Sequence, residues 1–367
     1  MTRIVVAGGF LGAGKTSLIL RAARMLRDKG LRVGIVTNDQ SNDLVDTQLA
    51  EAEGFKVGEV AGGCFCCRFD DLVREFDALS ADEADVIFAE PVGSCTDIVA
   101  TVIRPLKKLF GECFEVAPFS VLVDPTRDLG EMDKLICYLY RQQLSEADMI
   151  VVTKNDLVPD GVELVRGRFA GVLPERFTFS VCSRTGDGID GWLEAVLGTT
   201  SQQRSSISLD YELYAKAEAA LGWLNLSARW IHQEGATLQA IGEPLLKQLQ
   251  DECKGASLHA AHVKIMLKSD MSKARGGFTS NAGPCVWDDA GTDAVSRTGD
   301  LFVNARAEGS PERLSTAVQA AIYGAARSLG VNLTNVRIDC FSPKPPRPTH
   351  RLNSRGMPVS LAEASPD

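Results

Sequence analysis

Residues 9–16 read Gly-Phe-Leu-Gly-Ala-Gly-Lys-Thr and complete the pattern G-x-x-x-x-G-K-[ST] of a phosphate-binding loop. The β-branched run Arg3–Ala7 precedes this loop, and residues 16–29 carry apolar side chains at helical spacing. This context suits phosphate binding, because loop amides and a helix N-terminus both face the anion. The stretch therefore predicts a nucleotide site between a strand and a helix.

The pattern assigns roles within the loop. We expect Lys15 to reach the β- and γ-phosphates and the Thr16 hydroxyl to bind Mg²⁺. The residues predicted to bind nucleotide here are Gly9, Gly12, Ala13, Gly14, Lys15, Thr16 and Ser17. The alternative, a glycine-rich turn with a chance lysine, leaves the flanking strand and helix unexplained.

Composition narrows the class of protein. The chain has 367 residues and a net charge of −9, which predicts about two domains and no nucleic-acid partner. No apolar run reaches the roughly 18 residues that span a bilayer, so we expect no membrane segment. Ten cysteines without secretory features predict reduced thiols and a cytoplasmic protein.

Residues 1–198 alternate short apolar strands with helical patterns. This alternation predicts an α/β fold of the P-loop NTPase class, with a mostly parallel sheet and helices on both faces. The predicted strands are Ile4–Ala7, Arg32–Thr37, Val86–Ala89, Ser120–Val123, Met149–Thr153 and Phe177–Val181, and the predicted helices are Asp70–Leu79, Asp97–Phe110, Leu129–Ser145 and Val162–Val172. Ligands of such sheets bind where the strands end.

The remainder predicts a linker at residues 199–209, a smaller α+β domain at 210–341 and a disordered tail at 342–367 rich in Pro, Ser and Arg. The predicted helices of the second domain are Tyr211–Asn225, Gly242–Cys253 and Pro311–Leu329, and its predicted strands are His262–Lys268, Phe278–Trp287, Leu301–Ala307 and Val336–Phe341.

A motif for the base follows the strand that begins at Met149. Thr153, Lys154 and Asp156 fit [N/T]-K-x-D, in which the aspartate accepts hydrogen bonds from guanine and the lysine stem lies along the ring. Residues 182–186, Cys-Ser-Arg-Thr-Gly, occupy the place of a loop that covers the base and add Ser183 to the site. In this order after a phosphate loop, the motifs favour GTP over ATP.

Hydrolysis needs carboxylates that order Mg²⁺ and the attacking water. Asp39 and Glu90 directly follow predicted strands, and we expect both to be catalytic together with Lys15. Asp46 is a further candidate Mg²⁺ ligand, and the N–H of Gly93 is a candidate donor to the γ-phosphate. The alternative is that any one of these acids is a solvated loop residue.

Three thiols, Cys64, Cys66 and Cys67, follow a Gly-Gly pair. Such a cluster suits Zn²⁺, Cu(I) or Co²⁺, and three ligands leave a fourth position open for delivery. Cys95 is a candidate to complete the shell, as are His259 and His262. The alternative is that the cysteines pack as small hydrophobic residues.

These motifs resemble those of the CobW-like branch of metal-handling P-loop GTPases, relatives of the hydrogenase and urease nickel-insertion GTPases. The matching stretches are residues 9–16, 63–67, 90–93 and 153–156, within the first 198 residues. The chain departs from the branch at residues 38–41, Asn-Asp-Gln-Ser in place of Asn-Glu-Phe-Gly. Its Glu-Pro-Val-Gly at 90–93 is closer to the hydrogenase-type relatives.

The resemblance implies a GTPase that yields GDP and phosphate and binds Zn²⁺ or Co²⁺ at the three cysteines. It also implies delivery to a client metalloprotein, and it is compatible with a homodimer. Three alternatives stay open: a GTPase that loads or repairs a cobalamin-dependent enzyme, a P-loop kinase of a small metabolite, and a regulator with a structural zinc site.

Overall fold

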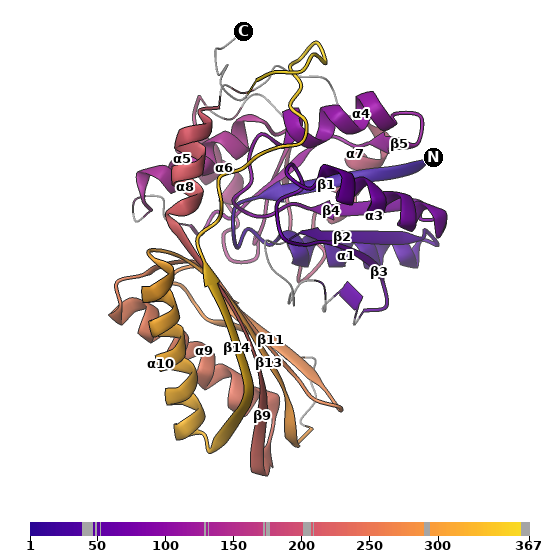
Figure 1. Cartoon of the computed structure of the whole chain (residues 1–367). Helices are drawn as coiled ribbons and strands as arrows, with labels where there is room; N and C mark the ends of the chain where they lie inside the picture. The colour runs from indigo at the N-terminus through magenta and orange to yellow at the C-terminus, as the bar shows by residue number, and fades with distance from the viewer. Residues whose placement is uncertain are drawn as a thin grey trace.

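The chain forms two sheets of different kinds in a computed structural model (Figure 1). The structure describes residues 1–38, 47, 50–51, 53–127, 130, 132–171, 173, 177–200, 207, 209–289 and 294–360. The first sheet is parallel, with the order β3-β2-β4-β1-β6-β7-β8 and β5 also paired with β1. The second is antiparallel, in the order β12-β11-β10-β13-β9-β14. The predicted α/β fold followed by an α+β unit is confirmed.

The first unit alternates strands and helices along the chain. Its strands are β1 (Thr2–Gly9), β2 (Val33–Asn38), β3 (Lys56–Val60), β4 (Val86–Glu90), β5 (Phe114–Val116), β6 (Ser120–Val123), β7 (Met149–Val152) and β8 (Phe177–Ser180). Its helices are α1 (Lys15–Asp28), α3 (Phe69–Ala81), the π-helix η1 (Val99–Ile103), α4 (Arg104–Phe110), α5 (Lys134–Ser145), α6 (Gly161–Arg168) and α7 (Ile189–Gly198). Six strands match the prediction closely, while β3 and β5 were not predicted.

Strand β1 shows why helices cover both faces of this sheet. Ile4 and Val6 belong to the apolar cluster that contains the buried side chains of α3. Val5 and Ala7 belong instead to the cluster that contains those of α1 and α7. Successive strand residues point to opposite faces, so an unbroken apolar run needs helical cover on each side.

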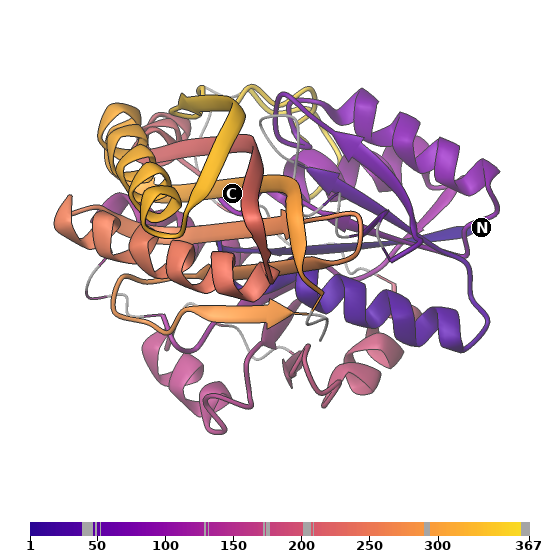
Figure 2. The ribbon, with the colours of Figure 1, turned by 90° about the horizontal axis from the view of Figure 1, so that it is seen from below.

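The second unit packs two helices on one face of its sheet, as Figure 2 shows. Its helices are α8 (Tyr211–Ala219), α9 (Leu238–Gly255) and α10 (Pro311–Ser328), and its strands are β9 (Leu221–Ala236), β10 (His259–Lys268), β11 (Lys273–Phe278), β12 (Val286–Asp289), β13 (Ser296–Glu308) and β14 (Val331–Phe341). Of these helices, α9 and α10 share an apolar cluster with the inward side chains of the strands.

Two predictions for the second unit are wrong. The predicted helix Tyr211–Asn225 ends early, because α8 stops at Ala219 and β9 begins at Leu221 as a central strand between β13 and β14. The predicted strand Phe278–Trp287 is a connection, with β11 ending at its first residue and β12 beginning at Val286. Much of the predicted linker at residues 199–209 lies outside the described residues.

The predicted disorder of the tail is also wrong for residues 342–360, which leave β14 and run back over the first unit (Figure 1). Leu352 donates its backbone N–H to the Ala100 carbonyl, and Arg104 donates to the Leu352 carbonyl at 2.8 Å. Arg351 pairs with Asp97 at 2.8 Å, with side chains only 7% and 1% exposed. The amino-acid composition of the tail does not predict long-range contacts of this kind.

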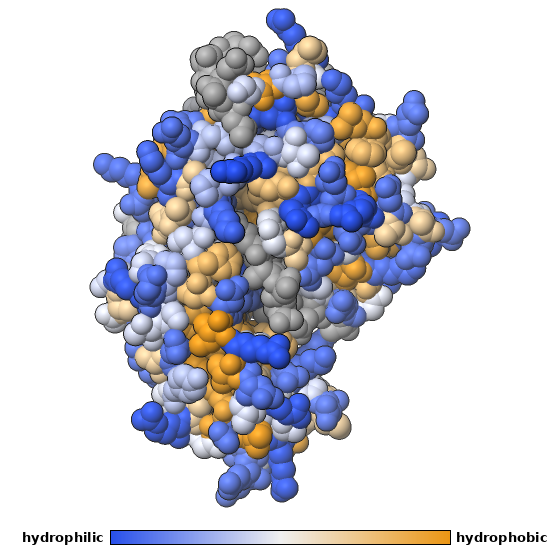
Figure 3. Space-filling view, in the orientation of Figure 1, coloured by the Kyte–Doolittle hydropathy of each residue, from blue (hydrophilic) through white to orange (hydrophobic). Residues whose placement is uncertain are grey.

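The surface in Figure 3 is mostly hydrophilic, with apolar side chains gathered along α10 and β14. Ala326, Val331 and Leu333 line a shallow groove there. Among the described helices, none combines the length and the apolar character that crossing a bilayer requires.

We expect Arg351→Ala to lower the free energy of unfolding by about 3 kcal/mol. The substitution removes the guanidinium that pairs with Asp97 and leaves the Asp97 carboxylate buried without that ion pair. The measurement is the midpoint of urea unfolding. Arg355→Ala, at an exposed position of the same tail, is the control and should change stability by no more than about 0.5 kcal/mol. Equal effects of the two substitutions would show that the tail is not anchored through Arg351.

Candidate functional site

The phosphate loop adopts a conformation that depends on its glycines. Gly9, Gly12 and Gly14 have φ angles of 131°, 78° and 89°, a region that other residues rarely adopt. Lys15, the first residue of α1, folds back over the loop and donates to the carbonyls of Gly9 at 2.9 Å and Phe10 at 3.4 Å. The loop thus leads directly into the N-terminus of α1, the arrangement that phosphate binding requires.

The segment after β4 lies directly on the phosphate loop. The Thr16 hydroxyl donates to Glu90 Oε1 at 3.0 Å, so the candidate Mg²⁺ ligand Thr16 and the candidate catalytic carboxylate Glu90 are adjacent. A side chain at Gly93 would lie 2.9 Å from the backbone nitrogen of Leu11, so only glycine allows this approach. The structure therefore brings the predicted residues Thr16, Glu90 and Gly93 together.

The predicted base motif is joined to the phosphate loop. Thr153 donates to the Ala13 carbonyl at 2.9 Å and also contacts the Val123 carbonyl at 3.2 Å. The threonine therefore links the phosphate loop to the end of β6. Asp156 accepts from Arg184 at 2.7 Å, which places the loop that contains Ser183 beside the motif.

Asp124 is a site residue that sequence analysis missed. It directly follows β6, accepts from Lys154 at 2.6 Å and also accepts from the Thr126 backbone and hydroxyl. Burial opposes its ionisation, but Lys154, the Thr126 hydroxyl and Arg127 together outweigh burial and hold the pKa of Asp124 below its usual range. The available signal was its place at the end of a strand, the same signal that identified Glu90.

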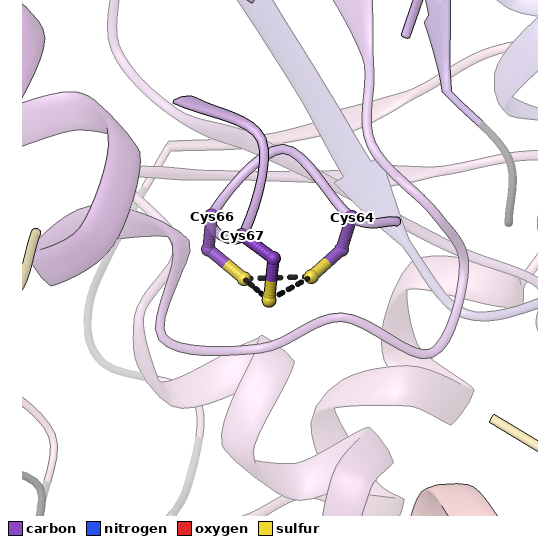
Figure 4. A group of neighbouring side chains, drawn as sticks. All are labelled: Cys64, Cys66 and Cys67. Atoms are coloured by element: carbon purple, nitrogen blue, oxygen red, sulfur yellow. Dashed lines mark hydrogen bonds between the residues drawn. The ribbon is translucent and has the colours of Figure 1, made fainter. Parts of the chain in front are cut away.

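The three thiols converge from one short loop, as Figure 4 shows. The Cys64 sulfur lies 2.8 Å from that of Cys66 and 3.2 Å from that of Cys67, and the last two are 3.8 Å apart. Thiolates bound to one tetrahedral Zn²⁺ at about 2.3 Å lie about 3.8 Å from each other. The cluster therefore fits a metal ion after Cys64 moves outward by roughly 1 Å.

Hydrogen bonds inside the cluster concentrate its negative charge on one sulfur. Side-chain hydrogen bonds with Cys66, Cys67 and then Cys95 hold the pKa of Cys64 well below its usual value. The hydrogen bond with Cys64 raises the pKa of Cys67 to about 12. Of these two thiols, Cys64 is therefore the one whose deprotonated form is favoured.

The loop that carries the thiols is held from two sides. Asn38, at the end of β2, donates to the carbonyls of Val60 at 2.8 Å and Gly63 at 2.7 Å, and accepts from the Phe65 N–H at 2.9 Å. From the tail, the Arg347 N–H donates to the Cys67 sulfur at 3.1 Å, and the Thr349 N–H donates to the Cys66 carbonyl at 2.9 Å. Sequence analysis predicted neither contact.

Cys95 connects this cluster with a buried polar network. It is 3% exposed and lies in the same buried cluster as Cys64 and Cys66, and its proximity to the Cys64 thiol raises the pKa of Cys95 well above its usual value. The neighbouring Ser94 donates to Glu218 of α8 at 2.6 Å. Burial raises the pKa of Glu218 to about 8, with the negative charge of Cys64 as a further cause. The segment after Glu90 therefore contacts both the thiols and α8.

The remaining predicted ligands have different outcomes. Asp39 and Asp46 fall outside the described residues. His259 is paired with Glu308 at 3.5 Å, and the charged groups around His262 are cations that include Lys15. Among the described residues, the group that could hold a metal ion consists of the three thiols and includes neither histidine.

Arg127 joins the phosphate loop to the second unit. It is 8% exposed and donates to the Leu11 carbonyl at 2.6 Å and to the Ala261 carbonyl of β10 at 2.9 Å. Its guanidinium also lies over the Phe10 ring, 5.0 Å from the centroid. One buried side chain thus fixes the position of β10 relative to the loop.

We expect Arg127→Ala to lower the free energy of unfolding by about 2–3 kcal/mol, because two buried carbonyls lose their donor. It should also weaken nucleotide binding, since the loop loses a support. Urea unfolding and titration with a fluorescent nucleotide measure the two effects. Arg141→Ala on the exposed side of α5 is the control, and an equally small effect at both positions would contradict the prediction.

Comparisons with known proteins identify a family and several similar structures. Residues 3–174 match the family described as CobW/HypB/UreG, nucleotide-binding domain, while a comparison with curated proteins found no match. Among solved structures, the hydrogenase maturation factor HypB from Archaeoglobus fulgidus is similar at 20% identity, over 54% of this chain and 89% of its own, with a TM-score of 0.39.

Two further structures are similar to the chain. HypB from Helicobacter pylori, solved in complex with nickel, is 18% identical over 54% of this chain and 86% of its own, with a TM-score of 0.41. The Zn(II)-bound YjiA GTPase from E. coli is 15% identical over 88% of this chain and 98% of its own, with a TM-score of 0.36. The family predicted from the motifs is confirmed: residues 3–174 are a nucleotide-binding domain of the CobW/HypB/UreG family.

Proposed function

We propose that the chain hydrolyses GTP and thereby controls the transfer of a transition metal from Cys64, Cys66 and Cys67 to a client metalloprotein. One observation carries the proposal. Glu90 contacts Thr16 of the phosphate loop, and Cys95 in the same segment lies in the buried cluster that also contains Cys64 and Cys66. A displacement of this short segment therefore acts on both sites.

In this proposal the chain's own residues hold and orient the nucleotide. Lys15 and the loop amides bind the phosphates, Thr153 keeps the base motif against the loop, and Asp156 accepts from guanine. Mg²⁺, for which Thr16 and Asp46 are the proposed ligands, supplies neutralising charge at the β- and γ-phosphates. Asp39 and Glu90 are proposed to orient water, which attacks the γ-phosphorus as the bond to the β–γ bridging oxygen breaks, giving GDP and phosphate.

The coupling follows from packing. The γ-phosphate contacts proposed for Gly93 order its segment, whose backbone is also held by Gln143 through the carbonyls of Gly93 and Cys95, each at 2.9 Å. Loss of the phosphate frees one end of the segment while Cys95 remains against Cys64. The metal shell then relaxes, and the ion, Zn²⁺ or Co²⁺ in this proposal, passes to the client.

We expect Asp156→Asn to weaken GTP binding by about 100-fold and to favour XTP, because the amide no longer accepts from the guanine amine but can donate to the xanthine oxygen. Steady-state hydrolysis of GTP, XTP and ATP measures the change. Asp160→Asn, at an exposed position four residues on, is the matched control.

Two results would contradict the nucleotide assignment. Wild-type preference for ATP would exclude guanine recognition, and a phosphorylated small metabolite would indicate a kinase. A wild-type protein that releases only GDP and phosphate from GTP supports the proposal.

We expect Cys67→Ser to lower Zn²⁺ affinity by at least about 100-fold, since one of three thiolate donors is lost. The triple change of Cys64, Cys66 and Cys67 to Ala should abolish stoichiometric binding. Competition with a chromophoric chelator measures affinity for Zn²⁺ and Co²⁺ with a GTP analogue and with GDP.

The control is Cys113→Ser at an exposed cysteine, which should leave both metals unaffected. Equal metal affinity in the two nucleotide states would overturn the coupling and favour a structural zinc site. Tight binding of cobalamin in place of the metals would favour the cobalamin-linked alternative.

A further inference from the structure

Strand β10 of the second unit forms one wall of the phosphate site. Its Ala261 belongs to one apolar cluster of the first unit, and its Met266 belongs to the other. The connection after β11 adds a contact, because a side chain at Gly12 would lie 2.4 Å from the Thr279 methyl group. The second unit is therefore packed on the phosphate loop rather than tethered beside it.

Strand alternation sorts the side chains of β10. Val263, Ile265 and Leu267 point into the core beneath α9 and α10. The residues between them, including Lys264, face the first unit. Lys264 is half-buried and donates to the Thr16 hydroxyl at 3.5 Å, and that hydroxyl donates in turn to Glu90. An ammonium group from the second unit thus lies where the terminal phosphates of a nucleotide are expected.

The surroundings are strongly cationic. Burial and then nearby cations, first among them Lys264 and Lys15, hold the pKa of His262 well below its usual range, so the imidazole is neutral. A nucleoside triphosphate is a multiply charged anion, and it would relieve the repulsion among these cations. A positive group aimed at a transferring phosphoryl also stabilises the charge that develops there.

We propose that Lys264 is a γ-phosphate ligand supplied by the second unit, which makes this unit a direct sensor of GTP against GDP. The inference rests on the proposed nucleotide function and adds the residue through which the second unit takes part. The contact exists only while the γ-phosphate is present. Hydrolysis therefore removes an attraction between β10 and the nucleotide, and the second unit senses the change without an intervening loop.

The test compares Lys264→Met, Lys264→Arg and wild type, with Lys268→Met as the control. Methionine keeps the apolar stem and removes the charge, and Lys268 lies on the same strand face with an exposed side chain. Affinities for a non-hydrolysable GTP analogue and for GDP are measured with fluorescent nucleotides, beside kcat and KM and a circular dichroism spectrum of each variant.

We expect Lys264→Met to weaken analogue binding by about 10- to 100-fold and GDP binding by less than about 3-fold. Lys264→Arg should restore part of the loss, and Lys268→Met should match wild type. An unchanged ratio of analogue to GDP affinity in Lys264→Met would overturn the inference. Absence of GTP hydrolysis by the wild-type protein would instead overturn the proposed function. The ratio of analogue to GDP affinity tests the role of Lys264 separately, because it is measured without hydrolysis.

Discussion

The hydrogen bond between Thr16 and Glu90 is the contact on which the rest of the site depends. It joins the first turn of α1 to the end of β4 and so fixes where the following segment starts. From that point Gly93 lies against the phosphate loop, and Cys95 lies in the buried cluster that contains Cys64 and Cys66. The parallel pairing of β1 and β4 allows this arrangement. The phosphate loop follows β1, the segment with Gly93 follows β4, and both strands end at the same edge of the sheet.

Much of the first unit could be predicted from the sequence, because its determinants are local. The phosphate loop, the thiol loop and the base motif each occupy a few consecutive residues after an apolar strand. Their order along the chain places them at one sheet edge. Asn38, at the end of β2, and Asp124, directly after β6, were missed as site residues. Asn38 bonds to the Gly63 carbonyl and Asp124 to Lys154, and the spacing of residues in the sequence does not predict these contacts.

The second unit was less predictable for a physical reason. The stretch from Leu221 to Leu226 reads Leu-Gly-Trp-Leu-Asn-Leu, whose apolar positions fit a helix as well as a strand. Pairing with β13 and β14 decides the outcome, and both partners lie far along the chain. The tail is similar, since Arg351 finds its carboxylate at Asp97, 254 residues away. Secondary-structure propensity reflects neighbouring residues and does not account for contacts between residues so far apart in the sequence.

The return of the tail to the first unit has a mechanical consequence. The second unit is entered through α8, whose Glu218 and Tyr211 contact the segment after Glu90, and it is left through the tail, whose Arg351 contacts the same segment at Asp97. These two connections add to the packing of β10 on the phosphate loop, so the second unit is tied to the first at its entry, at its exit and along its sheet. In the proposed mechanism, a shift of the segment after Glu90 therefore pulls on the second unit from both ends of its chain at once.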